Sequence, residues 1–256
     1  MAIIPKIAAV SYLNTIPFIY GIEHEGNLAV ELLLSPPNQC TQKYLDAEVD
    51  IALLPSIVVP TLTDAEVITD FCIGALGEVR SVVVVSDDPI EDVKTIYLDA
   101  HSQTSVQLAG YLAQNYWKIA PEWRVLEDYD QLNHSKDGEA FLLIGDKVFE
   151  HEGEFEYSYD LGEAWVEATG LPFAFAVWVA RKGTDTETID ALNIALEFGV
   201  EHTYEAILEY RADGSEVESH EYLTRNIDFL LDGAKRKALD KFWNSGVRIE
   251  PKRNPG

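Results

Sequence analysis

The sequence predicts an α/β protein made of two lobes that face each other across a cleft. Strand and helix patterns alternate through the first half of the chain, which is typical of parallel sheets covered by helices. A continuous apolar run at residues 81–86 (SVVVVS) precedes a second unit of this kind. Another apolar run, at 171–180 (LPFAFAVWVA), precedes a helical C-terminal part. We interpret the two runs as crossings, which place residues 1–84 and 178–256 in the first lobe and 85–177 in the second.

The first lobe begins with strand patterns that end in turn residues. Pro17 lies in the first turn of a predicted short helix, with Asn14 or Thr15 as its cap. The dipeptide Pro36-Pro37 ends a strand, and Asn38 then caps a helix. The predicted strands are 6–12, 28–34, 50–54 and 66–70, and the predicted helices are 15–20 and 39–47.

The second lobe repeats the pattern, and the chain then turns helical. Val106, Ala109, Leu112 and Ala113 share one face of a predicted helix at 104–116. The other predicted strands are 81–86, 95–98, 140–144 and 171–180, and the last helices cover 189–199, 201–211, 219–226 and 234–242.

The composition is that of a globular protein with an acidic surface. Its 256 residues are 47% hydrophobic, and no apolar run reaches the roughly 20 residues that span a bilayer. The N-terminal residues lack the pattern of a signal peptide, so a cytoplasmic location is expected. A formal charge of −25 argues against nucleic acid and membrane surfaces as partners, because both require basic patches. Cys40 and Cys72 stand alone, so we expect two buried or half-buried thiols and no metal site.

Small polar residues gather where four predicted strands end, at 11–15, 55–56, 99–105 and 145–146. In open α/β sheets, ligands bind beyond the carboxyl ends of the strands. Two of the clusters open into helices, whose free N–H groups bind carboxylates without help from Lys or Arg. Helix capping alone is the alternative explanation for each cluster.

Other motifs are weak or missing. The chain has no dinucleotide-binding or P-loop glycine pattern and no G-x-S-x-G. Six histidines show no metal-ligand spacing, and only His101 lies in a candidate site loop. Trp165, Phe173 and Phe175 are expected in the core, whereas Trp178 on the return crossing is the aromatic residue expected at the ligand.

Several stretches together resemble a known family. They are VSYLNTIPFIYG, EVRSVVVVS, LDAHSQTSVQLAGYL, LLIGDKVFE, YDLGEAWVEATGLPFAFAVWVA and YLTRNIDFLL. In this order they resemble the chorismate dehydratase family of the futalosine route to menaquinone. The resemblance implies a fold like that of type II periplasmic binding proteins. It also implies dehydration of chorismate to 3-[(1-carboxyvinyl)oxy]benzoate, with no metal or organic cofactor.

The resemblance also implies roles for individual residues. Asn14 and Ser81 would lie closest to the chemistry, and Ser102, Thr104 and Ser105 would bind a carboxylate. Family members often carry Arg at the position of Gln103, which leaves that task here to backbone N–H groups, Arg80 or Lys147. The remaining predicted substrate-binding residues are Ser11, Thr15, Ser56, Arg80, Gln103, Gly145, Asp146 and Trp178.

These residue types favour elimination assisted by the substrate. Ser, Asn and Thr are poor bases without an activating partner, so the enolpyruvyl carboxylate of chorismate is expected to take the ring proton. Two alternatives remain. One is the sister enzyme that makes 1,4-dihydroxy-6-naphthoate, although its Ser-Pro-Cys-Pro-Asn-Asp type motif is missing. The other is a cytoplasmic receptor that binds a small carboxylate without catalysis.

Overall fold

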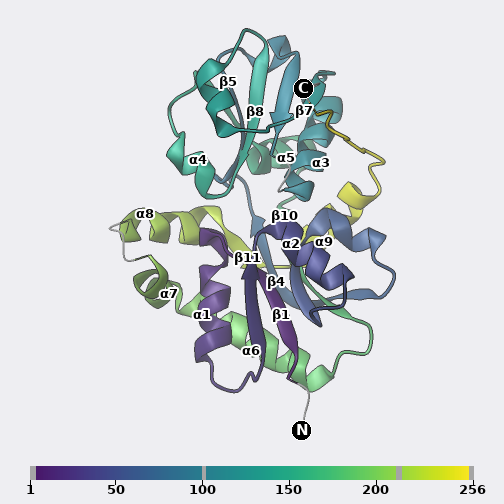
Figure 1. The fold of residues 1–256 in the computed structure, drawn as a ribbon, viewed down its shortest axis with the longest axis vertical. Helices are drawn as coiled ribbons and strands as arrows, with labels where there is room; N and C mark the ends of the chain where they lie inside the picture. Colours follow the sequence, from purple (N-terminus) through teal and green to yellow (C-terminus); the bar gives the residue numbers. More distant parts are fainter. Residues whose placement is uncertain (1–3, 100–101, 212–214, 254–256) are drawn as a thin grey trace.

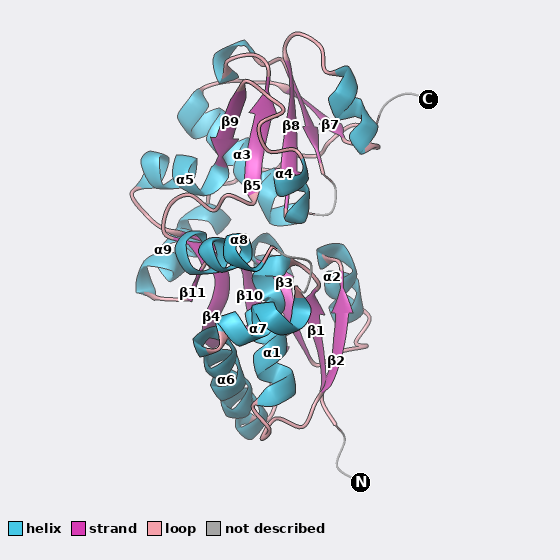
Figure 2. Cartoon of the chain, turned by 90° about the vertical axis from the view of Figure 1, so that its left-hand side faces the viewer, coloured by secondary structure: helices cyan, strands magenta, loops and turns pink. Residues whose placement is uncertain are grey.

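The computed structural model, which describes residues 4–99, 102–211 and 215–253, contains two separate β-sheets. Each sheet is covered by helices, and the two units lie one above the other along the longest axis (Figures 1 and 2). The lower sheet in Figure 1 runs in the order β11 (Asp228–Leu230), β4 (Ala65–Ala75), β10 (Phe173–Arg181), β3 (Ile51–Pro55), β1 (Lys6–Val10) and β2 (Glu31–Ser35). The upper sheet runs in the order β7 (Glu122–Val125), β6 (Thr95–Leu98), β8 (Glu139–Ile144), β5 (Val82–Ser86) and β9 (Tyr157–Asp160).

Each helix belongs to one of the two units, as each strand does. The lower unit holds α1 (Ile16–His24), α2 (Pro37–Leu45), α6 (Thr186–Glu201), α7 (Thr203–Tyr210), α8 (Glu216–Glu221) and α9 (Gly233–Trp243). The upper unit holds α3 (Gln103–Leu112), α4 (Asp146–Glu150) and α5 (Leu161–Thr169).

Both sheets are mixed, whereas the sequence pattern predicted parallel sheets. β1 pairs in parallel with β2 and β3, and β6 pairs in parallel with β7 and β8. β10 is antiparallel to both β3 and β4, and β5 is antiparallel to both β8 and β9. For β5 and β10 the difference follows from the crossings, because a strand that enters a sheet from the other unit runs against the strands already there. β11 is antiparallel to β4 as well.

The two crossings are short. The chain leaves the lower sheet after β4, reaches β5 in the upper sheet, and returns from α5 into β10. The predicted lobe boundaries, 84/85 and 177/178, fall inside β5 and β10. Each of these strands forms its hydrogen bonds with one sheet along its whole length.

Glycines allow α1 and α6 to pack closely. A Cβ atom on Gly21 would lie 1.9 Å from the carbonyl oxygen of Ala195, and one on Gly199 would lie 1.9 Å from that of Pro17. Such distances exclude any side chain, so the two helices touch backbone to backbone. This contact fixes α1, whose N-terminal end carries Asn14 and Thr15.

The C-terminal segment makes a third connection, which the sequence analysis did not predict. After α9 the chain runs back to the upper unit, in yellow in Figure 1. The N–H of Lys252 donates to the Trp123 carbonyl at 2.9 Å, and the Val125 N–H donates to the Lys252 carbonyl at 3.0 Å. The side-chain amide of Gln107 in α3 donates to the Ile249 carbonyl and accepts from the Ile249 N–H, both at 2.8 Å. The segment therefore joins the two units independently of the crossings.

Two expectations from composition can be compared with the structure. Cys40 and Cys72 are buried free thiols, as predicted. Across residues 4–99, 102–211 and 215–253, no helix combines the length and apolar character needed to cross a membrane.

Candidate active site

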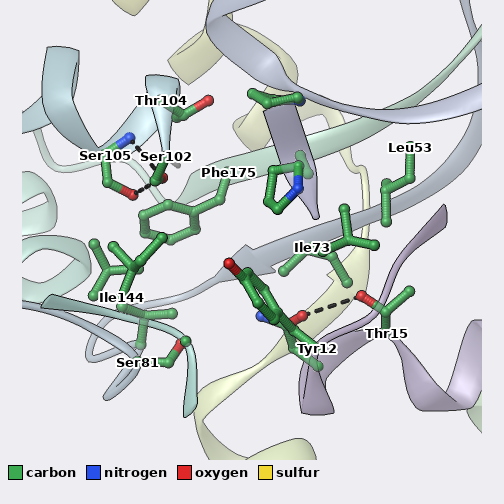
Figure 3. A pocket seen from close by; sticks show the side chains of 18 residues that line it. Tyr12, Thr15, Leu53, Ile73, Ser81, Ser102, Thr104, Ser105, Ile144 and Phe175 are labelled. Carbon is green, nitrogen blue, oxygen red and sulfur yellow. Dashed lines mark hydrogen bonds between the residues drawn. The ribbon is translucent and has the colours of Figure 1, made fainter. Parts of the chain in front are cut away.

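A cavity lies between the two sheets, where the predicted strand ends meet (Figure 3). The ends of β1, β3 and β8 and the residues that follow β6 all reach it, which agrees with the expectation that ligands bind beyond strand ends. The 18 described residues that line it are Val10, Tyr12, Asn14, Thr15, Pro37, Leu53, Pro55, Ile73, Val79, Ser81, Val82, Ser102, Thr104, Ser105, Ile144, Gly145, Phe175 and Ala176.

The upper unit contributes the N-terminal end of α3. Ser102 caps this helix, because its Oγ accepts a hydrogen bond from the Ser105 N–H at 3.4 Å and donates to the Ser105 Oγ at 2.7 Å. The Thr104 hydroxyl accepts from the N–H of Ile57 in the lower unit at 3.4 Å. Capping and cavity lining therefore occur together, and the positive end of α3 faces the cavity.

The lower unit contributes Asn14 and Thr15, between β1 and α1. The Thr15 hydroxyl donates to Asn14 Oδ1 at 3.2 Å, and Asn14 Nδ2 donates to the hydroxyl of Tyr222 at 3.5 Å. The Tyr222 hydroxyl donates in turn to Ser81 Oγ at 2.7 Å. The structure thus brings together Asn14 and Ser81, the two residues predicted to lie closest to the chemistry.

Tyr12 is the one ionisable side chain among the described residues of the lining. Burial, with a smaller contribution from the carboxylates of Asp99 and Asp146, raises its pKa to about 12. A Cβ atom on Gly145, where φ is 60°, would lie 3.5 Å from the Tyr12 ring. Tyr12 therefore stays neutral at physiological pH and contacts the upper unit.

Comparison with a family model decides the family. The model described as menaquinone biosynthesis matches residues 5–247. The chain belongs to this menaquinone biosynthesis family. The sequence resemblance predicted this membership, and the match confirms it.

Known proteins similar to the chain agree with this assignment and with the fold. A chorismate dehydratase of Thermus thermophilus is 27% identical over 190 residues, which are 67% of this chain and 68% of the relative. Protein AF1704 from Archaeoglobus fulgidus has a TM-score of 0.74 at 17% identity, covering 93% of this chain and 95% of its own. The Candida albicans protein CA3427, described as having the generic periplasmic binding protein fold, has a TM-score of 0.63 at 15% identity and covers 99% of both chains. The predicted periplasmic-binding-protein-like fold is thereby confirmed.

Seven of the predicted site residues line the cavity of this family member. They are Asn14, Thr15, Ser81, Ser102, Thr104, Ser105 and Gly145. Ser11 and Gln103 are exposed and lie outside the lining, although each neighbours a residue that belongs to it. His101 lies outside the described residues.

Four further predicted residues lie outside the lining. The Arg80 guanidinium lies over the Phe149 ring and pairs with Glu152 at 3.1 Å. Asp146 is half-buried and lies 4.0 Å from Arg211, and burial raises the pKa of its carboxyl. Trp178 and Ser56 are fully buried beside the cavity rather than in its wall.

The crossing that carries Ser81 is held by Asp160, a residue that sequence reasoning missed. The Asp160 carboxylate accepts hydrogen bonds from the N–H groups of Val79 and Arg80 at 3.1 and 2.6 Å. Tyr222 was missed as well, whereas Tyr12 lies in the polar cluster predicted at 11–15 but was not singled out there as a site residue. All three lie within the stretches that carry the family resemblance, but no local pattern distinguishes Asp160 and Tyr222 from core residues.

A group of possible metal ligands lies away from the cavity. Glu23, His24 and Glu209 offer ligand atoms within 4.8 Å of one another, and all three are exposed. They lie at the opposite end of α1 from Asn14, and His24 already pairs with Glu209 at 3.0 Å. This group therefore has no role in the site described above.

Proposed function

We propose that the protein is a hydro-lyase that removes water from chorismate and forms 3-[(1-carboxyvinyl)oxy]benzoate. One observation carries the proposal. Asn14 and Ser81, which come from different units and are 67 positions apart in sequence, face one cavity and share the hydroxyl of Tyr222. Membership of the menaquinone biosynthesis family and similarity to the Thermus thermophilus chorismate dehydratase support it.

The cavity suits a substrate with two carboxylates. The N-terminal end of α3 approaches it from the upper unit and presents backbone N–H groups with a partial positive charge. At the start of α1 the Ile16 N–H already donates to the Leu13 carbonyl and Pro17 has no N–H, so the lower unit offers the side chain of Asn14 instead. Hydroxyls of Ser102, Thr104 and Ser105 surround the α3 end. Among the described lining residues there is no Lys or Arg, so neutral donors hold the carboxylates. Apolar walls such as Phe175 and Ile144 suit the ring.

The elimination removes a proton from the ring carbon that bears the ether and a hydroxide from the neighbouring carbon. The C–H electron pair forms the new ring double bond, which makes the ring aromatic. The described lining offers no carboxylate or imidazole as a base. We therefore assign the proton to the enolpyruvyl carboxylate of the substrate, which would then pass it to the departing hydroxide to give water. Asn14 and Ser81 orient this carboxylate and the leaving hydroxyl. Orientation of this kind contributes about 7–11 kcal/mol when the geometry is right.

Incubation of the purified protein with chorismate tests the proposal. The expected result is a product lighter by one water, identified as the aromatic enol ether by mass spectrometry and NMR. Asn14→Ala and Ser81→Ala should each lower kcat about 100-fold. The surface variants Asn133→Ala and Ser158→Ala serve as controls and should keep wild-type turnover.

Three other outcomes would contradict the proposal. A binding protein would form a complex with chorismate and release no product, and the sister naphthoate-forming enzyme would leave chorismate unchanged. If Asp146→Asn abolished turnover but kept chorismate binding, a protein carboxylate would be the base and the substrate-assisted step would be wrong.

A further inference from the structure

Tyr222 connects the two residues that the proposed function places at the chemistry. It begins the helical turn at Tyr222–Asn226, is 2% exposed, and packs its ring edge-on against Phe149 with 5.2 Å between ring centres. Its hydroxyl lies 2.7 Å from Ser81 Oγ and 3.5 Å from Asn14 Nδ2. Core packing accounts for the ring, but it does not account for a hydroxyl shared by these two side chains.

The chemistry of the three groups fixes the direction of each hydrogen bond. The amide nitrogen of Asn14 can only donate, so the Tyr222 oxygen accepts from it. The single proton of the phenol therefore forms the hydrogen bond to Ser81 Oγ. Asn14 Oδ1 accepts from the Thr15 hydroxyl at 3.2 Å, which fixes the amide in the same orientation. Burial raises the pKa of Tyr222, so its hydroxyl keeps its proton throughout the physiological pH range.

The consequence concerns Ser81. Because Ser81 Oγ already accepts a hydrogen bond from Tyr222, its own hydroxyl proton is free to turn toward another acceptor, and the side chain lines the cavity. The second N–H of Asn14 Nδ2 has the same freedom. Both residues therefore offer donors to whatever occupies the cavity, and carboxylate and hydroxyl oxygens are the groups that accept them.

We propose that Tyr222 is a positioning residue that orders this chain of hydrogen bonds, so that Asn14 and Ser81 act as donors to the substrate. The inference rests on the proposed dehydration. Without the phenol, Ser81 Oγ can donate to a neighbouring protein oxygen, and Asn14 loses the partner that orients its amide. We expect binding of the substrate to change little, because Tyr222 does not line the cavity, whereas the elimination step loses its ordered donors.

The test is a double-mutant cycle with Tyr222→Phe, Ser81→Ala and the double variant. Tyr222→Phe keeps the ring and its contact with Phe149, so the melting temperature should stay close to that of the wild type. We expect kcat to fall about 10- to 100-fold with KM within about twofold. In the Ser81→Ala background, Tyr222→Phe should cause no further loss. If Ser81→Ala is too slow for steady-state assays, the same cycle is run on single-turnover rates with the enzyme in excess over chorismate.

Tyr44→Phe is the matched control. Tyr44 is 1% exposed, and its hydroxyl has no hydrogen-bond partner among the residues that the structure describes. Removal of this hydroxyl should leave kcat unchanged. Wild-type kcat in Tyr222→Phe would overturn the inference, and so would an equal loss with and without Ser81. If the wild-type protein did not convert chorismate, the proposed function would be wrong. The results for the variants contradict only the role of Tyr222, so the two failures are distinguishable.

Discussion

Replacement of Asp160 by alanine tests how the crossing holds Ser81 in place. Asp160 is 9% exposed, and its carboxylate accepts hydrogen bonds from the N–H groups of Val79 and Arg80, the two residues before Ser81. Arg80 has a φ of 62°, a left-handed conformation that residues with a side chain rarely adopt. The strained backbone depends on these hydrogen bonds, so we expect their loss to let Ser81 move and kcat to fall.

The loss of stability can be worked out from the hydrogen bonds. The same carboxylate caps α5 by accepting from the N–H groups of Gly162 and Glu163 at 2.8 and 3.0 Å. Loss of a helix cap costs about 1 kcal/mol. Val79 is 1% exposed, and a buried N–H left without an acceptor costs about 2 kcal/mol more. The free energy of unfolding should therefore fall by about 3 kcal/mol, which lowers Tm by roughly 6–12 °C for a chain of this size.

Asp185→Ala is the matched control for Asp160→Ala. Asp185 is exposed, caps α6 by accepting from the Thr188 N–H at 3.1 Å, and follows the end of β10 that points away from the cavity. Its loss should cost about 1 kcal/mol and leave turnover unchanged. Urea unfolding and chorismate consumption are measured for both variants. Equal losses of stability, or wild-type kcat in Asp160→Ala, would refute the assigned role of Asp160.

Three other features give testable expectations. Lys235 is fully buried and pairs with Asp228 at 2.5 Å. Asp228→Ala leaves this charge buried without its partner and should lower the free energy of unfolding by about 3–5 kcal/mol, whereas Lys235→Met should lower it much less. Equal losses for the two variants in urea unfolding would contradict this. Burial raises the pKa of the Cys40 and Cys72 thiols from 9.0 to about 12. The unfolded chain therefore loses these protons first, and stability should fall between about pH 9 and 12, by about 1.4 kcal/mol per pH unit for each thiol. Urea unfolding of Cys72→Ala should show a shallower fall, and an unchanged slope would contradict the assignment. Gln107→Ala should release the C-terminal segment, seen as faster amide hydrogen exchange at residues 247–252, and unchanged exchange would show that other contacts hold it.

The strand ends could be predicted because their pattern is local. Apolar runs followed by small polar residues mark where parallel strands stop, and the sheet then brings these ends together without further information. The cavity lining at Asn14, Ser102 and Gly145 follows from this rule alone. Ser81 was predicted from the family resemblance, and it lies at the start of a strand, where the rule says nothing.

The pairing of the strands could not be predicted in the same way. The sequence of β10 (Phe173–Arg181) does not indicate that this strand inserts between β3 and β4, because the neighbours of a strand depend on contacts between residues distant in sequence. The C-terminal segment is similar. Its attachment combines the Gln107 side chain, backbone hydrogen bonds and the packing of Val247 and Ile249 near Gly110 of α3, and two apolar residues are too few to form a detectable periodicity.

Arg80 and Ser81 show where side-chain direction decides the chemistry. The two residues are adjacent, yet Ser81 lines the cavity while the Arg80 guanidinium lies against Phe149 and Glu152. An arginine beside the enolpyruvyl carboxylate would stabilise its charged form and lower its pKa. That would weaken the group to which the proposed reaction assigns the proton. In the proposed reaction, neutral donors from Ser81 and Asn14 would orient the carboxylate with a smaller loss of basicity, which is the arrangement that substrate-assisted elimination requires.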